Sequence, residues 1–262
     1  MRLISLVAAM AASLAAQTAP PNAAGISIGH IHLIVGDPDA QRKLFVDLLG
    51  AEVKHAGPLE MWKLPGTYIV IQKARTAPTD GSDGSTVNHF GFAVKSYPDI
   101  KTKLTAAGLK VHADHPDNKQ VTFEFPEKIL VEFSEDPTLN VPVKFHHIHV
   151  AATDQEGLRD WYVKTFGGDS GKRGNFPASK FPGGEVDFLK AATAAAPTKG
   201  RTLDHIGFEV KGLEEFCKKL EAQGVTFDMK YREMPALNGL KIAFVLDPVG
   251  TRIELTEGLA AY

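Results

Sequence analysis

Four stretches of similar sequence decide how this chain folds: GHIHLIVGD at 29–37, NHFGFAVKS at 88–96, HHIHVAATD at 146–154 and DHIGFEVKG at 204–212. Each places a histidine before an apolar run with partial alternation, which is the pattern of a half-buried β-strand. The repeat aligns four histidines: His30, His89, His147 and His205. They follow one another at intervals of 59, 58 and 58 residues. Such regular spacing indicates four internal repeats.

An amphipathic helix is expected after each of these strands. Apolar residues recur with helical spacing in four segments: 39–49, 98–107, 158–166 and 213–223. A glycine follows each segment, and glycine most readily takes the left-handed conformation that ends a helix. These glycines are Gly50, Gly108, Gly167 and Gly224. Strand-like runs such as TYIVIQKA and EVDFLKA complete each unit. The pattern therefore predicts an α+β protein built of four β-α-β-β-β units.

The four units are of two kinds. The first and third carry a second histidine two residues after the aligned one, at His32 and His149. The second and fourth share the motif His-x-Gly-Phe and end in a glutamate between apolar residues, Glu132 and Glu254. This alternation predicts a duplicated pair of units.

We expect the first two units to form an N-terminal domain, 26–138, and the last two a C-terminal domain, 143–259. The segment 136–142, which contains two prolines, would be the boundary. Residues 1–16 have the short positive start and apolar run of a signal peptide, so we expect an exported protein, periplasmic or secreted. Residues 17–25 would be a linker.

The composition narrows the possible partners. The 262 residues carry a net charge of −2, from 29 Lys and Arg against 31 Asp and Glu, so nothing points to nucleic acid. The apolar run of the leader is too short to cross a membrane, and no span is expected once it is removed. The one cysteine excludes a disulfide framework. We expect a monomer or homodimer that acts on a small molecule.

Each predicted domain holds two aligned histidines and a glutamate. The first set is His30, His89 and Glu132, and the second is His147, His205 and Glu254. Two imidazoles and one carboxylate can hold a divalent metal and leave positions open for substrate. Such donors suit Fe(II), Mn, Zn, Ni or Co. The alternative is that the glutamates face solvent on the outer side of a sheet.

Other polar and aromatic residues are candidates for the rest of the site. Because strand side chains alternate, His32 and His149 share a face with the presumed ligands and are candidate general bases. They could instead fill the cup as ordinary polar residues. A mixed aromatic and basic loop at Phe176, Lys180 and Phe181 could line the substrate mouth, or be an ordinary solvent loop.

The pattern resembles the vicinal oxygen chelate superfamily. The resemblance covers about residues 28–259 and is carried by the four histidine strands and by LLGAEV at 48–53, TFGGDSG at 165–171 and DPVGTRIELTE at 247–257. It implies βαβββ modules paired into two cupped mixed sheets, as in glyoxalase I. It also implies a divalent metal that binds two vicinal oxygens of a substrate.

Three activities follow from that resemblance. Four modules in one chain are similar to the extradiol dioxygenases, which implies Fe(II) on His147, His205 and Glu254. The second is a non-redox lyase or isomerase like glyoxalase I, which implies a fourth ligand near Ile71 or Phe188, where Gln72 or Asp187 could serve. The third is metal-free binding of a small molecule, as in bleomycin-binding relatives.

Overall fold

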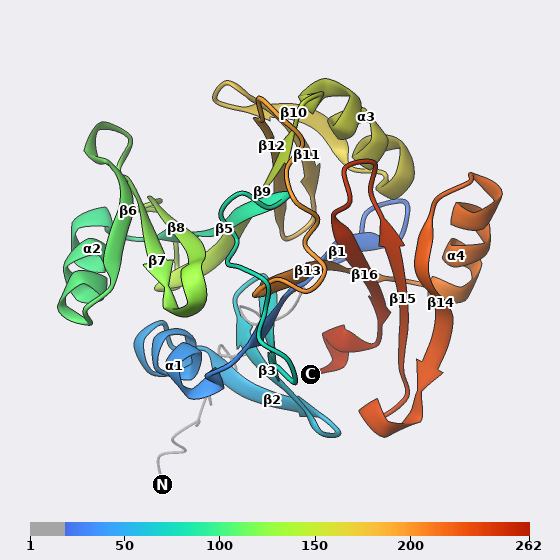
Figure 1. The fold of residues 1–262 in the computed structure, drawn as a ribbon, viewed down its shortest axis with the longest axis horizontal. Coiled ribbons are helices and arrows are strands. Elements are labelled where there is room, and N and C mark those ends of the chain that lie inside the picture. Colours follow the sequence, from blue (N-terminus) through green and yellow to red (C-terminus); the bar gives the residue numbers. More distant parts are fainter. Residues whose placement is uncertain (1–18) are drawn as a thin grey trace, which may run out of the picture.

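The computed structural model describes residues 19–262 and contains two eight-stranded mixed sheets (Figure 1). The first unit contains β1 (Ile26–Val35), α1 (Pro38–Arg42), which continues as a π-helical segment (Lys43–Leu48), β2 (Glu52–Ala56), β3 (Leu59–Leu64) and β4 (Thr67–Lys73). The second contains β5 (Val87–Val94), α2 (Tyr97–Ala106), β6 (Lys110–His115), β7 (Gln120–Phe125) and β8 (Ile129–Glu135).

The other two units repeat this order. The third contains β9 (Val143–Ala152), α3 (Gln155–Phe166), β10 (Asp169–Arg173), β11 (Phe176–Phe181) and β12 (Gly184–Lys190). The fourth contains β13 (Leu203–Val210), α4 (Leu213–Ala222), β14 (Phe227–Met234), β15 (Leu240–Leu246) and β16 (Arg252–Glu257). The predicted β-α-β-β-β units and the α+β class are confirmed. The four glycines that follow the helices all have positive φ, as predicted.

The first and fourth units share one sheet, and the second and third share the other. Sheet I has the order β14-β15-β16-β13-β1-β4-β3-β2 and so combines the first and fourth units. Sheet II has the order β10-β11-β12-β9-β5-β8-β7-β6 and combines the second and third. The two units of each sheet meet through an antiparallel pair, β1 with β13 or β5 with β9.

The expectation that the first two units share one sheet and the last two the other was therefore wrong. The segment 136–142 is not a boundary between sheets, because it connects β8 to β9 inside sheet II. The chain instead changes sheet through residues 74–86 and 191–202, which run side by side (Figure 1). The amide of Thr202 donates to the carbonyl of Asp80 at 3.0 Å, and that of Thr79 to Gly200 at 2.9 Å.

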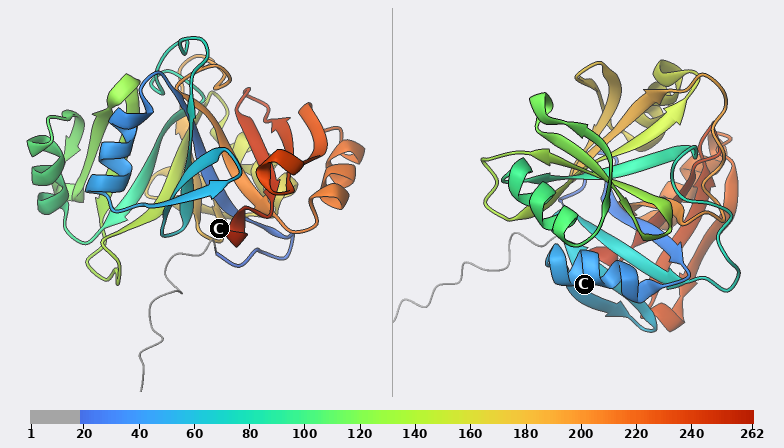
Figure 2. Two further views of the ribbon diagram at one scale, coloured as in Figure 1. Left: turned by 90° about the horizontal axis from the view of Figure 1, so that it is seen from below. Right: turned by 60° about the vertical axis from the view of Figure 1, so that its left-hand side comes forward.

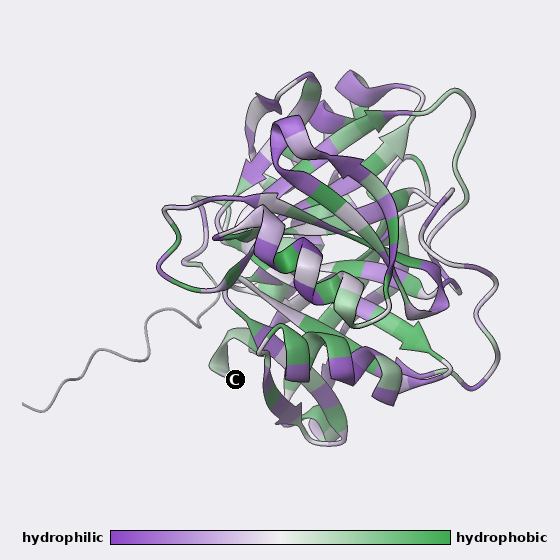
Figure 3. Ribbon diagram, turned by 90° about the vertical axis from the view of Figure 1, so that its left-hand side faces the viewer, coloured by the Kyte–Doolittle hydropathy of each residue, from purple (hydrophilic) through white to green (hydrophobic). Residues whose placement is uncertain are grey.

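One apolar core joins the two sheets and their helices. Phe45, after α1, lies against Phe90 and Phe125 of the second unit, with ring centroids 6.4 and 5.3 Å away. At the other end, Phe166 of α3 stacks on Phe208 of the fourth unit at 4.9 Å. Figure 2 shows α1 and α2 side by side at one end of the molecule, with α4 at the other. The helices carry both hydrophobic and hydrophilic residues (Figure 3), as expected for helices that cover a core.

Alternation along the strands leaves the other face of each sheet for the site. On β1, Ile31 and Leu33 are fully buried in the core, whereas His30 and His32 point to the opposite side. This opposite face forms a cup in each sheet.

The structure describes only part of the N-terminal segment for which predictions were made. The predicted signal peptide, 1–16, lies outside the described residues. Of the predicted linker 17–25, residues from 19 onward are described, and the Asn22 amide donates to the carbonyls of Phe166 and Gly167 at the end of α3. Within residues 19–262, no helix has the length and apolar character needed to span a membrane.

Candidate metal centres

Each cup gathers three histidines and one glutamate. Site I, in sheet I, comprises His30, His32, His205 and Glu254. Site II, in sheet II, comprises His89, Glu132, His147 and His149. In each site one donor atom from every residue lies within 4.8 Å of the others.

All six predicted ligands lie in these clusters, but the predicted sets were wrong. His30 lies with His205 and Glu254, and His147 lies with His89 and Glu132. The reason is the pairing of units in the sheets. Site I combines the first and fourth units, and site II combines the second and third. The candidate bases join the clusters as the fourth member of each.

Strand register places the four donors in two rows. In site I, β1 pairs His30 with Gly207 and His32 with His205. The parallel pairing of β13 with β16 then puts Glu254 beside Gly207. Thus one row reads histidine, glycine, glutamate across three strands, and the second row holds two histidines.

The glycine of each His-x-Gly-Phe motif makes room for an imidazole. A Cβ at Gly207 would lie 2.1 Å from Cε1 of His30, and one at Gly91 would lie 2.2 Å from Cε1 of His147. No side chain fits at such distances, so only glycine allows the ring to lie across the neighbouring strand. The motif marks a unit of the second kind as the partner of a unit of the first kind, but it occurs in both the second and the fourth unit and does not distinguish between them.

The donor distances of site I match those around a metal ion. Oε2 of Glu254 lies 2.9 Å from Nε2 of His30 and 2.8 Å from Nε2 of His205. Two donors at right angles, each about 2.1 Å from one ion, would be about 3 Å apart. Both ring nitrogens of His32 are buried and have no hydrogen-bond partner in the described chain. Buried polar atoms without partners are costly, and a bound cation would satisfy them. The site therefore fits a divalent metal.

The charges of site I are also suited to a cation. Burial alone would raise the pKa of Glu254, but hydrogen bonds from His205 and His30 outweigh it and hold the pKa below its usual range. Burial, aided by the positive charge of His205, holds the pKa of His32 well below its usual value. A carboxylate and a neutral imidazole are the forms that bind metal. Oδ1 of Asp204 lies 2.6 Å from Nδ1 of His205 and orients that ring.

A mostly apolar cavity of about 290 Å³ opens on site I. Apolar side chains from both units of sheet I line it: Leu59, Val70, Met229, Leu237, Leu240 and Phe244. Gln72, one of the candidates for a fourth ligand, lines this cavity but is not in the donor cluster. The β4 residue that pairs with His32 is Val70. His32 itself supplies the fourth donor.

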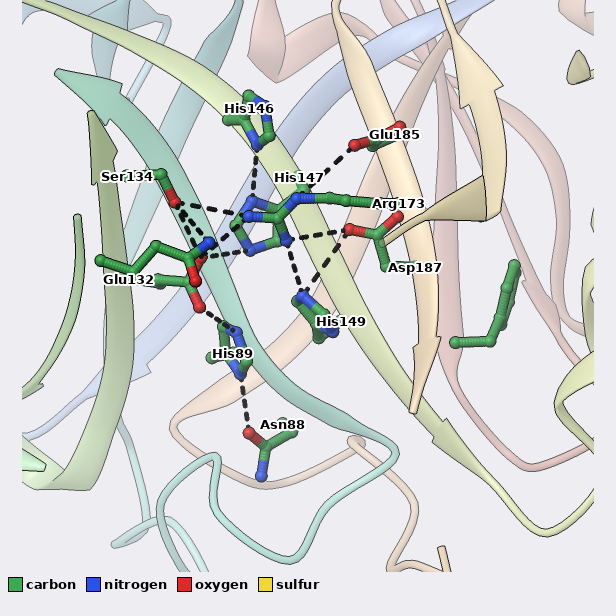
Figure 4. A network of polar contacts seen from close by, with 12 residues as sticks. Asn88, His89, Glu132, Ser134, His146, His147, His149, Arg173, Glu185 and Asp187 are labelled. Atoms are coloured by element: carbon green, nitrogen blue, oxygen red, sulfur yellow. Dashed lines mark hydrogen bonds and ion pairs between the residues drawn. The ribbon is translucent and has the colours of Figure 1, made fainter. Parts of the chain in front are cut away.

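Site II differs because an arginine enters the cluster (Figure 4). Nη1 of Arg173 lies 2.9 Å from Nε2 of His149 and donates to Oδ2 of Asp187 at 3.2 Å. Nη2 of Arg173 donates to Oε1 of Glu132 at 3.0 Å. Asp187, the other candidate fourth ligand, thus accepts a hydrogen bond from an arginine. Arg173 could not be found from the repeat, because the first unit has Ala56 at the equivalent position.

The cavity at site II is larger and more polar, at about 680 Å³. Its polar walls include His112, His115, Asn118, Gln120, Thr122 and Asn175. Phe176 also lines it, with its ring edge-on to His149 at 5.2 Å. Phe176 therefore lies at a cavity beside one of the two donor clusters.

Lys180 and Phe181 do not belong to either mouth, and the loop predicted around them was wrong. Phe176, Lys180 and Phe181 lie on strand β11. Phe181 is an odd number of positions from Phe176, so it faces the opposite side and packs in the core against Phe208 at 5.0 Å. Lys180 is exposed and lines neither of the two cavities.

Comparison with known proteins places this fold. The model of the Glyoxalase/Bleomycin resistance protein/Dioxygenase superfamily matches residues 144–255. No curated protein matched the sequence. A Bacillus subtilis protein described as a "putative dioxygenase" has 16% identity and a TM-score of 0.69, with 92% of this chain and 86% of that chain covered.

Glyoxalase I from Zea mays has 13% identity and a TM-score of 0.69, with 90% of this chain and 94% of that chain covered. At these identities the two structures support the fold rather than an activity. The sequence of the third and fourth units, residues 144–255, thus matches the model of the Glyoxalase/Bleomycin resistance protein/Dioxygenase superfamily, and the whole chain shares its fold with these two structures.

Proposed function

We propose that this chain is a divalent-metal enzyme that acts at site I on a small, largely apolar molecule with two adjacent oxygen atoms. The reaction class is a non-redox isomerisation or lyase reaction. It removes a proton from, or returns it to, a carbon that bears one of those two oxygens. One observation carries the proposal: four buried donors converge at an apolar cavity, and both nitrogens of one of them, His32, lack a partner within the described chain.

The number of donors favours this class over oxygen chemistry. His30, His32, His205 and Glu254 would hold the ion, which would act as a Lewis acid on the substrate oxygens. Four protein donors in a six-coordinate site leave two positions, which two vicinal oxygens would fill. Three imidazoles and one carboxylate suit Zn, Ni, Mn or Co as well as the Fe(II) implied by the resemblance to dioxygenases.

The remaining roles fall to residues around the donors. Asp204 fixes the orientation of His205, and the Arg252 guanidinium holds Asp204 in turn at 2.8 Å. Glu254 uses Oε2 for both histidine contacts, so Oε1 is its free oxygen for taking a proton from bound substrate. The apolar walls exclude water, which strengthens each of these electrostatic interactions.

A second candidate is ring cleavage by O₂, with Fe(II) on His30, His205 and Glu254 only. Its supporting observation is that His32 makes no ion pair with Glu254, whereas the other two histidines lie within 2.9 Å of it. In this reading His32 would be the general base, the role expected from its place in the strand.

Two assays separate these candidates. Protein loaded with Zn or Mn is incubated without oxygen with aryl α-hydroxyketones and with hemithioacetals of phenylglyoxal in D₂O. We expect deuterium to enter the carbon beside the oxygens, by NMR. Oxygen uptake with catechols by Fe(II)-loaded protein, and no deuterium exchange, would favour the second candidate.

Matched variants assign the activity to a cup. Glu254→Gln should abolish exchange, whereas Glu132→Gln, the same change at site II, should leave exchange intact. Failure of the protein to retain any metal would contradict both candidates and favour metal-free binding of a small molecule.

We also propose that the enzyme is exported. The basis is the apolar run at residues 3–16. Mature protein recovered outside the cytosol should begin near Gln17 by N-terminal sequencing, and a cytosolic protein with an intact N-terminus would contradict this.

A further inference from the structure

We propose that Arg173 is a built-in cation that takes the place of a metal ion at site II. The chain would then bind one divalent ion, at site I, and keep site II as a metal-free polar pocket. Both cups hold three histidines and a glutamate, so the difference between them rests on the arginine and its partners.

The guanidinium of Arg173 lies among the donors that a metal would need (Figure 4). It occupies Nε2 of His149 at 2.9 Å and Oε1 of Glu132 at 3.0 Å. Asp187 at 3.2 Å and Glu185 at 3.8 Å complete its acidic surroundings. An arginine is always charged in proteins, so a second cation between these residues would be repelled at close range. Hydrogen bonds from Nη1 to Asp187 and from Nη2 to Glu132, two different carboxylates, also fix the guanidinium in place.

The equivalent positions of site I cannot supply such a cation. Arg173 pairs with Phe176 in the β10–β11 hairpin, and the first unit has Ala56 paired with Leu59 at that place. Asp187 pairs with His149 on β12, and the first unit has Val70 paired with His32. Thus both the arginine and its carboxylate partner are replaced by small or apolar residues in site I.

The arginine that lines the cavity of site I is held by other partners. Arg252 bonds Asp204 and Asp228, each at 2.8 Å, and its guanidinium lies 3.8 Å from the ring centroid of Phe244. It makes no ion pair with Glu254 among the described residues. Site I is therefore left with an acidic donor that only histidines contact, and site II with one that already has a permanent cation.

The test is a count of metal ions on the full-length chain. Apo-protein is titrated with Co(II), followed by its visible spectrum and by elemental analysis after dialysis. We expect one equivalent for the wild type, two for Arg173→Met, none for Glu254→Gln and one for Arg173→Met combined with Glu254→Gln. Arg173→Lys, which keeps a cation, should stay at one. Two equivalents on the wild type, or no gain in Arg173→Met, would overturn the proposal.

The experiment separates this inference from the proposed function. If the wild type binds none and Arg173→Met binds one, the metal enzyme at site I fails but the role of Arg173 stands. If Arg173→Met does not fold, the single glutamate variants decide. The proposal requires Glu254→Gln to lose the one ion and Glu132→Gln to keep it, and the reverse result would overturn it.

Discussion

The imidazole of His30 lies against the backbone of Gly207 on the neighbouring strand, where a Cβ would come within 2.1 Å of its Cε1. His147 and Gly91 repeat this contact in the other sheet at 2.2 Å. The first histidine of one unit and the glycine of another are thus complementary in shape. This contact joins the first unit to the fourth and the second to the third.

Gly207→Ala should therefore weaken metal binding at site I. The added methyl group displaces the ring of His30, and a misplaced donor lowers affinity by about 10- to 100-fold, as when a partner that orients a ligand is lost. Titration of the variant with Co(II) measures the change. Gly91→Ala makes the same clash at site II and is the matched control, so it should leave the affinity for the first ion unchanged. Equal losses in both variants would contradict this assignment.

Asp204→Asn should also weaken metal binding, without a change in fold. The carboxylate of Asp204 lies 2.6 Å from Nδ1 of His205, and a charged partner makes the imidazole a stronger ligand. The second unit already has an amide at this position, since Asn88 lies 2.7 Å from Nδ1 of His89. We expect a loss of about 10- to 100-fold in affinity. Circular dichroism and a Co(II) titration check the two parts, and unchanged affinity would show that Asp204 only supports the strand.

The sequence predicted the units and the donors, but not their partners. The histidines, glutamates and helix-ending glycines recur in each unit and can be read locally. The pairing of β1 with β13 joins segments that are far apart in the sequence. By sequence pattern alone, β1 could pair equally well with β5. Arg173 was missed for a different reason. It contacts Glu132 across 41 residues, and no repeat of it marks the position.

The stability of the protein should contain a pH-dependent contribution from Asp247, which lies outside the donor clusters, in the turn between β15 and β16. Burial raises the pKa of Asp247 to about 6 from 3.8, despite hydrogen bonds from Thr251, Tyr162 and Val249. A carboxyl whose pKa is raised on folding stabilises the protein below its unfolded pKa, and that stability is lost as pH rises through the folded pKa. The window is therefore pH 4 to 6.

Asp247→Asn removes this titration. At 1.36 kcal/mol per pKa unit, the free energy of unfolding of the wild type should fall by about 3 kcal/mol relative to the variant between pH 3 and 7. Urea unfolding across this pH range measures the difference. A constant difference between the two proteins would mean that Asp247 titrates alike in the folded and unfolded chain.

The arginine of site II should be transferable to site I. Ala56 and Val70 occupy the positions that Arg173 and Asp187 have in the other cup, and both are buried. The double variant A56R/V70D places a guanidinium beside Glu254 and gives it a second carboxylate. We expect the single bound ion to be lost, with the fold retained because the new charges are paired.

The two single variants are the controls for this exchange. V70D adds an acidic group without a cation and should keep the ion. A56R alone leaves the new charge with only Glu254 as a partner, and breaking up a buried pair of this kind costs about 3–5 kcal/mol. Its thermal transition should therefore lie below that of A56R/V70D. If A56R/V70D folds and still binds one equivalent of Co(II) at site I, the arginine does not determine which cup takes the metal.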